Sequence, residues 1–378
     1  MRSRAAGAVC AALIAALSIG VPAAAPAPHM LVGILDEVHT LYGNPDQTFP
    51  ILKKLRVQVL RVDLYWGGQF GVANSKPDDA TDPSDPAYDW SLYDRTAQYA
   101  NQYGVKLMLT VWGTPKWANG GKPGRYAPKK ISDLQKFAYA AATRYSGTFV
   151  GDDGRTLPAV KLWTAWNEPN QPFQLAPQYK KVGGTWRMQS AIDYAKICNA
   201  VYTGIHSTML SGEKVACGVT APGGNNNPGG IRPTPSPLAF LLAAKKAGMK
   251  KFDAYAHHPY PRKPSETPTT RPARNAVTIA NIGDLEREVS RLYGRKPIWI
   301  TEYGYQTNPP DRSVGVSWSK QAKYLTQSYA LARKDPRIQM MLWFLLKDEP
   351  VLGGWQSGLM TAKGKKKPAF AAFTRLPH

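Results

Sequence analysis

Cysteine is scarce in this sequence of 378 residues, which contains only three, and none belongs to a Cys-x-x-Cys or Cys/His cluster. Structural zinc sites draw on such clusters, so the cysteine pattern points to no metal centre. The Gly-x-Gly-x-x-Gly turn of dinucleotide-binding folds is also missing after the first apolar run. A Gly-x-Ser-x-Gly turn of serine hydrolases is missing as well. These absences argue against a nucleotide-dependent enzyme and a serine hydrolase, and no cofactor or metal is expected.

Acidic residues are few relative to basic ones. The chain has 48 Lys and Arg against 26 Asp and Glu, a formal net charge of +22, and Lys363, Lys365, Lys366 and Lys367 form a run near its end. This balance predicts electrostatic attraction to an anionic cell-wall polymer or acidic polysaccharide. Nucleic acid is not expected as a partner, and a basic surface that is merely solvated remains the plain alternative.

Long apolar runs are confined to the amino-terminal end. Arg2 and Arg4 precede an uncharged run over residues 5–21, and small residues follow over 21–27. This is the three-part pattern of a secretory signal, which we place at residues 1–25, with an uncleaved anchor as the alternative. We therefore expect a secreted protein of residues 26–378 that does not interact with membrane after cleavage.

Two cysteines remain after the signal, Cys198 and Cys217, and each lies in an apolar segment. In an exported protein two such cysteines can pair. Buried free thiols explain the same pattern equally well, so the pairing stays open.

From residue 30 onward, short apolar runs alternate with longer segments of helical period. The eight candidate strands are Leu31–Leu35, Val57–Leu64, Lys106–Val111, Val160–Ala165, Val215–Val219, Phe252–Ala256, Pro297–Thr301 and Gln339–Leu345. The candidate helices between them are Thr48–Leu55, Trp90–Tyr103, Ser132–Tyr145, Ser190–Leu210, Pro237–Gly248, Ile279–Tyr293 and Ser319–Arg333. Such alternation is typical of an α/β fold with a parallel sheet.

The connections favour a closed barrel over an open sheet. Those that follow strands are long and rich in Pro, Gly, Trp and Asp, as over residues 66–89, 112–131 and 169–189. Several that precede strands are short, such as 103–105 and 248–250. One elaborated face and one economical face are typical of a (β/α)₈ barrel, whose active site lies at the carboxyl ends of the strands. We predict a single (β/α)₈ TIM barrel with elaborated βα loops.

Two glutamates stand at strand ends on opposite parts of the predicted ring. Glu168 follows the fourth strand and Glu302 ends the seventh. Glycoside hydrolysis uses two carboxyl groups, which stand about 5–5.5 Å apart in a retaining enzyme, one as acid/base and one as nucleophile. We predict Glu168 as the acid/base and Glu302 as the nucleophile.

Further candidates for substrate binding lie at the ends of other strands. Arg61 and Tyr260 can keep the nucleophile ionised, and Asn167 can hydrogen-bond the 2-hydroxyl of the sugar. His258, Trp112 and Trp343 complete the predicted set.

Together these motifs resemble those of a large clan of retaining (β/α)₈ glycosidases with catalytic Glu on the fourth and seventh strands. Trp166-Asn167-Glu168-Pro169 is similar to the acid/base motif of that clan, and Ile300-Thr301-Glu302-Tyr303-Gly304 to its nucleophile strand. The resemblance implies that Arg61 and Tyr260 lie near the nucleophile, His258 in the sugar subsite, and Trp343 beneath the reacting sugar as a platform.

Within the clan, Gly113-Thr114-Pro115-Lys116-Trp117 and the acid/base motif look most like family 39, which includes β-xylosidases and exopolysaccharide hydrolases. The set also resembles family 5, but family 5 has a His near the end of the third strand, where this chain has Trp112 and Thr114. The resemblance implies a secreted retaining hydrolase of a β-linked polysaccharide or oligosaccharide. The alternative is a barrel that binds carbohydrate or cell wall without turnover.

Overall fold

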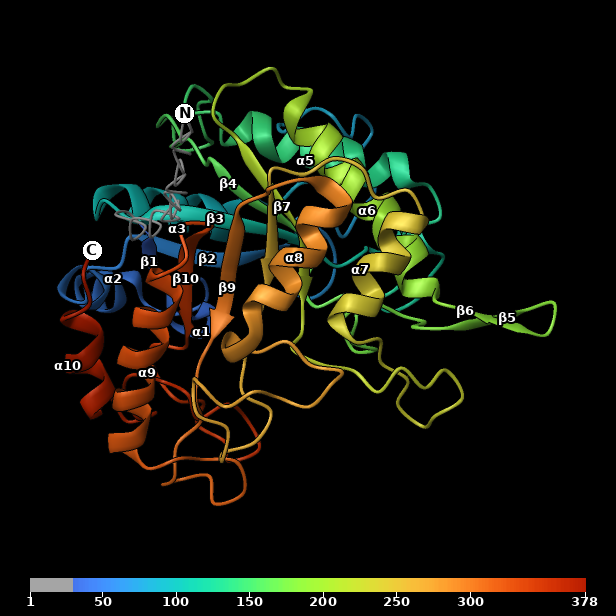
Figure 1. The fold of residues 1–378 in the computed structure, drawn as a ribbon. Helices are drawn as coiled ribbons and strands as arrows, with labels where there is room; N and C mark the ends of the chain where they lie inside the picture. The colour runs from blue at the N-terminus through green and yellow to red at the C-terminus, as the bar shows by residue number, and fades with distance from the viewer. Residues whose placement is uncertain (1–29) are drawn as a thin grey trace, which may run out of the picture.

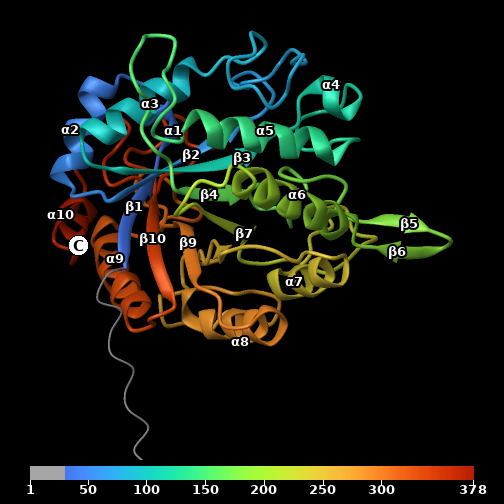
Figure 2. The ribbon, with the colours of Figure 1, turned by 90° about the horizontal axis from the view of Figure 1, so that it is seen from above.

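The computed structural model describes residues 30–378, so the expected signal peptide lies outside the described residues. Eight parallel strands close into a barrel in the order β1-β2-β3-β4-β7-β8-β9-β10, and β10 pairs with β1 to complete it. Helices surround the barrel, as the two views show (Figure 1, Figure 2). The predicted (β/α)₈ fold is confirmed.

Each predicted strand overlaps an observed one. The barrel strands are β1 (Leu31–Leu35), β2 (Val59–Tyr65), β3 (Lys106–Trp112), β4 (Leu162–Ala165), β7 (Lys214–Thr220), β8 (Ala254–His257), β9 (Ile298–Tyr303) and β10 (Ile338–Phe344). In this numbering the fourth and seventh barrel strands are β4 and β9.

The helices that cover the barrel also match the predicted segments. They are α2 (Pro45–Lys54), α3 (Ser91–Gln102), α5 (Ile131–Arg144), α6 (Gln189–His206), α7 (Pro237–Lys246), α8 (Ile282–Tyr293) and α9 (Trp318–Arg333). Shorter elements are α1 (Glu37–Thr40), α4 (Lys116–Asn119), η1 (Ile279–Asn281) and α10 (Pro368–Thr374). Within residues 30–378 the search for a helix with the length and apolarity of a membrane span finds none.

Besides the short helices α1 and α4, three features of the fold were not predicted. The antiparallel hairpin β5 (Lys180–Val182) and β6 (Thr185–Arg187) lies in a segment expected to be a loop, and it projects from the barrel in both views (Figure 1, Figure 2). Its Gly183-Gly184 turn, with positive φ at both residues, is a hairpin signal in the sequence. The last helix, α10, was missed, and α6 ends at His206 rather than at Leu210.

The inside of the barrel is filled by side chains, so it forms a floor beneath the carboxyl-end face. Inward residues of six barrel strands form one buried cluster: Val59, Met108, Ala216, Val219, Ala254, Ala256, Trp299, Met340 and Leu342. One inward residue of β1 is Gly33, which has no side chain. A Cβ at this position would lie 2.5 Å from the carbonyl oxygen of Val59 and 2.7 Å from the side chain of Leu342. A substrate therefore cannot pass through the barrel, and the strand-end polar residues lie above this floor at the carboxyl end.

Cys198 on α6 and Cys217 on β7 form a disulfide, which resolves the alternative left open by the sequence. Both cysteines are fully buried. The bond ties a covering helix to the barrel wall.

Replacing Cys198 by Ser should lower the free energy of unfolding by about 2–4 kcal/mol, because the bond closes a loop between residues 19 positions apart and so restricts the unfolded chain. Urea unfolding followed by circular dichroism measures the change. Reductant should weaken the natural protein by a similar amount and leave the variant unchanged. A variant with the unfolding curve of the natural protein would contradict a stabilising bond.

Candidate active site

A cavity of about 470 Å³ opens at the carboxyl ends of the barrel strands. Residues from β1, β2, β9 and β10 and from the segments that follow β1, β4, β7, β8 and β10 contribute to it. Its lining consists of Leu35, Glu37, Asp63, Asn167, Glu168, Gln171, Gln174, Ala221, Pro222, Tyr260, Pro261, Arg262, Glu302, Phe344 and Trp355. Both predicted catalytic glutamates are in this set.

Glu302 is held at both carboxylate oxygens. Arg61 Nη1 donates to Oε1 at 2.8 Å, and the Tyr260 hydroxyl donates to Oε2 at 3.0 Å. Arg61 and Tyr260 therefore lie beside Glu302, where the resemblance places them. Burial raises the pKa of Tyr260 well above its ordinary value, so its hydroxyl stays protonated and remains a donor. Burial also raises the pKa of Glu302, while the charge of Arg61 opposes that shift.

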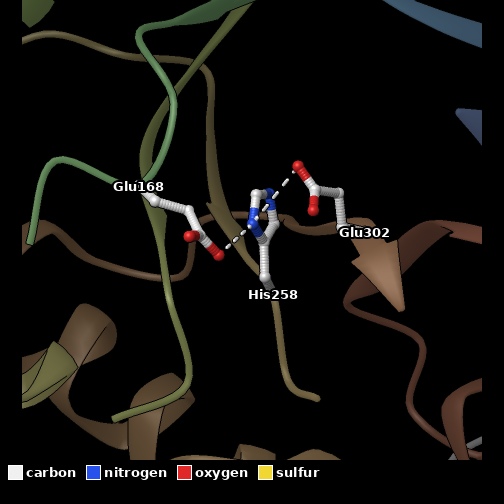
Figure 3. Close-up of side chains that lie close together, drawn as sticks. All are labelled: Glu168, His258 and Glu302. Atoms are coloured by element: carbon white, nitrogen blue, oxygen red, sulfur yellow. Dashed lines mark hydrogen bonds and ion pairs between the residues drawn. The ribbon is translucent and has the colours of Figure 1, made fainter. Parts of the chain in front are cut away.

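His258 lies between the two glutamates (Figure 3). Its Nδ1 is 3.0 Å from Glu168 Oε1 and 3.6 Å from Glu302 Oε1. Its Nε2 is 3.2 Å from Arg61 Nη1 and 3.0 Å from the Thr301 hydroxyl. An arginine can only donate, so Nε2 accepts and the proton of the neutral ring is on Nδ1. The ring then donates to Glu168.

Burial lowers the pKa of His258 to about 3, with the charge of Arg61 acting in the same direction. The imidazole is thus neutral over the physiological pH range. It supplies an oriented donor between the two carboxyl groups but does not add a positive charge there.

Glu168 has a different environment from Glu302. Its carboxyl group accepts a hydrogen bond from His258, and a fifth of its side chain is exposed to the cavity. Burial raises its pKa to about 7, which the charge of Arg61 only partly offsets. One glutamate is therefore held by a guanidinium and a phenol, and the other retains its proton close to neutral pH.

The backbone at Glu168 is turned sharply. Trp166 and Glu168 have φ values of 66° and 35°, in a region that few non-glycine residues adopt. Trp166 is fully buried and its indole nitrogen donates to the carbonyl of Gln174 at 2.8 Å. This contact anchors the turn that directs Glu168 into the cavity, and such local strain is often found at functional sites.

Glu168, His258 and Glu302 each offer one atom that could bind a metal ion, and these three atoms lie within 4.8 Å of one another. A cation could use this donor set only beside Arg61, whose guanidinium already contacts both Glu302 and His258. A fixed positive charge at that distance opposes a metal ion. The arrangement therefore fits a pair of opposed carboxyl groups better than a metal centre.

Asn167 lies in the same network. Arg61 Nη2 donates to its Oδ1 at 2.7 Å, and its side chain lines the cavity. Among residues 30–378 its Nδ2 has no acceptor, so the amide is left as a donor toward a bound sugar. This is the group expected to meet the 2-hydroxyl.

The expectation for Trp343 is wrong. Its side chain is fully buried on the outer side of the barrel wall, and its indole nitrogen donates to the carbonyl of Ser357 at 2.9 Å. Successive residues of a strand point to opposite faces, so the next residue, Phe344, faces the cavity together with Trp355. An aromatic platform is thus provided by Phe344 and Trp355.

Trp112 lies at the end of β3 but does not line the cavity. Its ring packs edge-on against Tyr65 at 5.4 Å and against Trp166 at 5.8 Å. Trp112 is partly exposed and shares its strand face with Met108 and Thr110, which point into the barrel. Its part in substrate binding stays a prediction.

Two acidic residues of the cavity were not predicted. Asp63 is two positions after Arg61 on β2, and period-two alternation could have placed both on one face. Glu37 lies two residues after the end of β1 and accepts from the Tyr65 hydroxyl at 3.0 Å. Burial and the neighbouring Asp63 raise the pKa of Glu37 to about 8. The sequence signal for Glu37 was its position after the first strand.

The lysine run is not a uniform basic surface. Lys367 is buried and donates to Asp348 at 2.6 Å and to Thr307 at 2.8 Å, whereas Lys363, Lys365 and Lys366 are exposed. This ion pair fixes the segment before α10 to the loop after β10. Lys367 is therefore a structural residue.

Comparison with known proteins also indicates a glycosidase. A family model described as the glycosyl hydrolase catalytic core matches residues 238–373, just over a third of the chain, a segment that includes His258, Tyr260 and Glu302. No curated protein matches the sequence significantly. The family match supports a glycosidase.

Solved structures with the same fold include several glycosidases. A family 39 glycoside hydrolase from Bacteroides cellulosilyticus WH2 is similar with a TM-score of 0.62 and 18% identity, over 92% of this chain and 63% of its own. A glucosidase from Croceicoccus marinus gives 0.64 and 15%, over 93% and 68%. Fungal β-1,4-galactanases give 0.58 and 15%, over 92% and 100%. At these identities the likeness establishes the shared fold, and the chain spans less than two thirds of the family 39 enzyme.

Replacing Arg61 by Met should lower the free energy of unfolding by about 3–5 kcal/mol, because it leaves Glu302 and Asp63 buried without their counter-charge. Both carboxyl groups would then gain a still higher pKa in the folded state, so the folded protein would bind more protons. The loss should accordingly grow as pH rises from 5 to 8. Urea unfolding at several pH values tests this, and a loss that does not change with pH would refute the charge argument.

Proposed function

We propose that this chain is an exported retaining glycosidase that cleaves a β-linked polysaccharide or oligosaccharide, with Glu168 as acid/base and Glu302 as nucleophile. The observation that carries the proposal is the approach of an oxygen of Glu168 to one of Glu302 within 4.8 Å across the mouth of the barrel. Retaining enzymes have carboxyl groups about 5–5.5 Å apart, and inverting ones about 6.5–9.5 Å. A pair of oxygens within 4.8 Å supports the retaining arrangement, in which no water molecule fits between nucleophile and sugar.

In the first step a Glu302 oxygen attacks the anomeric carbon and forms a glycosyl ester. The bond from that carbon to the leaving oxygen breaks, and Glu168 gives its proton to this oxygen. The raised pKa of Glu168, about 7, suits an acid that is still protonated near neutral pH. Arg61 and Tyr260 hold both oxygens of Glu302 and so orient the attacking lone pair.

In the second step a water molecule replaces the departed group. Glu168, now ionised, takes a proton from this water. The oxygen of the water bonds to the anomeric carbon, and the ester bond from that carbon to Glu302 breaks. The donor on His258 Nδ1 stabilises the ionised form of Glu168 between the two steps. The free amide of Asn167 binds the 2-hydroxyl, a contact that strengthens as the transition state forms.

Export is supported by the signal pattern at residues 1–25 and is compatible with the Cys198–Cys217 disulfide. A β-linked substrate is supported by the resemblance of the acid/base and nucleophile motifs to the clan of retaining glycosidases. The similar fungal enzymes are β-1,4-galactanases, but the sugar of this chain is not assigned by that likeness.

A series of 2-deoxy-2-fluoro glycosides should label Glu302, because slow turnover of these compounds traps the glycosyl ester. Peptide mass spectrometry locates the label, and proton NMR of the first product formed should show the anomer of the substrate. Glu302→Gln should reduce kcat by about 10⁴-fold or more, by analogy with the loss of other covalent nucleophiles. Activity that survives Glu302→Gln, or an inverted first product, would refute the mechanism. Binding without turnover would favour the carbohydrate-binding alternative.

The rate on substrates with poor leaving groups should fall as pH rises through about 7, because Glu168 must carry a proton in the first step and its pKa is raised to about 7. The pH profile of kcat/KM measures this limb in the free enzyme. Glu168→Gln should abolish the limb and slow such substrates far more than activated aryl glycosides. An unchanged alkaline limb in that variant would assign it to another group.

A further inference from the structure

The charges around the cavity are divided between two halves of the barrel mouth. A line from Glu168 after β4 to Glu302 on β9 leaves β7 and β8 on one side and β10, β1, β2 and β3 on the other. Glu37 and Asp63 line the cavity on the β1–β2 side. Arg262, from the loop after β8, lines it on the β7–β8 side.

The side chain of Arg262 lies against the backbone of another loop. Its guanidinium lies against Gly223, where a Cβ would meet Nε at 3.0 Å and Cζ at 3.1 Å. The carbonyl of Gly223 in turn accepts from the amide of Gln171, three residues after Glu168. Gly223 thus links the arginine to the acid/base loop by backbone contact.

Arg262 contacts a carboxylate through its backbone, whose N–H donates to Glu266 Oε2 at 2.8 Å. Within the described part of the chain no carboxylate lies at ion-pair distance from its guanidinium, although Arg61, Arg144, Arg155, Arg271, Arg287 and Arg291 are all paired. Its side chain is exposed. An unpaired guanidinium on the wall of a substrate cavity is free to bind a carboxylate in the bidentate geometry that arginine favours.

The same wall continues outward with a second arginine that has no ion-pair partner among residues 30–378. Arg232, from the loop after β7, stacks over the ring of Phe173 at 5.0 Å. Phe173 is 63% exposed and belongs to the loop that carries Glu168. An exposed aromatic ring beside a guanidinium offers an apolar face and a positive charge to the next unit of a chain.

The catalytic groups show which half receives the leaving group. Phe344 on β10 lines the cavity on the β1–β2 side, and Arg61 on β2 holds Oδ1 of Asn167, so the attacked sugar is placed against Phe344 on this side. The acid must face the leaving oxygen, which places the leaving group beyond Glu168, toward Gln171 and Arg262. The acidic half therefore holds the sugar that is attacked, and the basic half holds the sugar that leaves.

We propose that the wall formed by Gln171, Gly223 and Arg262 is a leaving-group subsite for a carboxylate-bearing sugar, so that the substrate is an acidic heteropolysaccharide cut between a neutral sugar and a uronate. This inference rests on the proposed glycosidase function. Asp63 accepts a hydroxyl group of the neutral sugar and opposes a uronate on its side. The environment that Glu37 shares with Asp63, which raises the pKa of Glu37 to about 8, adds a donor to that half.

The test uses polymers whose only difference is the carboxylate. Deacylated gellan contains a glucose, which has a 2-hydroxyl, β-linked to glucuronate, and carbodiimide–borohydride reduction converts the carboxylate to a hydroxymethyl group. For polymers that are cleaved, kcat/KM should be on the order of tenfold higher for the native form than for the reduced form. Arg262→Gln should remove most of this ratio, and Gly223→Ala should reduce it by displacing the guanidinium without removing its charge.

Arg291→Gln is the matched control, since it removes one exposed positive charge from α8, away from the cavity. It should leave the ratio unchanged. Equal rates on native and reduced polymers, or an equal loss on both in Arg262→Gln, would overturn the proposed subsite. Thermal unfolding of each variant shows whether a loss comes from the fold.

Affinity measured by calorimetry on the Glu302→Gln variant separates this inference from the proposed function. Tighter binding of native than of reduced polymer, with loss of the difference when Arg262→Gln is added, supports the subsite even if the natural protein hydrolyses nothing. In that case the glycosidase proposal fails and the subsite stands. Turnover of neutral polymers with no preference for the carboxylate would instead support the glycosidase and overturn the subsite.

Discussion

The buried guanidinium of Arg61 is the interaction on which the rest of the site depends. It is fully buried and donates to Thr110, Asp63, Asn167 and Glu302. A buried charge is tolerated only when it is paired and its donors are satisfied. The barrel meets that requirement with side chains from several strands, so one residue fixes the positions of the others. The orientation of Glu302 and the position of the Asn167 amide both follow from it.

The same residue also sets the roles of the other groups. Because Arg61 can only donate, it makes Nε2 of His258 an acceptor and directs the ring proton to Glu168. Glu302 receives the charge of Arg61 at 2.8 Å, whereas Glu168 receives only a neutral donor. Two glutamates with the same intrinsic chemistry are thereby separated into a held carboxylate and a carboxyl group with a pKa of about 7. Glycosidases assign the acid and the nucleophile by placing two carboxyl groups in environments that give them different pKa values.

Much of this could be predicted from the sequence because it follows from strand ends. The carboxyl ends of parallel strands meet at one edge, so Glu168 and Glu302 could be brought together without knowing any loop. Errors arose where the face of a strand decided the outcome. Trp343 and Phe344 are neighbours on β10, and only the register of that strand determines which of them faces the cavity.

Long-range contacts between loops could not be predicted at all. Trp355, 41% exposed in the loop after β10, meets Tyr260 of the loop after β8 at 5.6 Å, and Arg262 rests on Gly223 of a third loop. No periodicity in a single sequence specifies such pairings. Glu37 was visible as a residue after the first strand, but its function depends on Asp63 and Tyr65, which become its neighbours only when the barrel closes.

The net charge of +22 by itself gives little information about the substrate, and the structure shows why. Lys367 belongs to the basic run in the sequence but neutralises Asp348 inside the fold, and Arg61 neutralises carboxylates of the site. An anion is attracted to the site by a positive charge that no carboxylate neutralises. Such a charge is a guanidinium that has no ion-pair partner among the described residues and that lies where substrate must pass. Arg262 meets both conditions, and it faces the cavity from the side opposite Glu37 and Asp63. A cavity with opposite charges at its two ends favours one direction of binding for a chain in which neutral and acidic sugars alternate, because the reversed chain would place its carboxylate against Asp63.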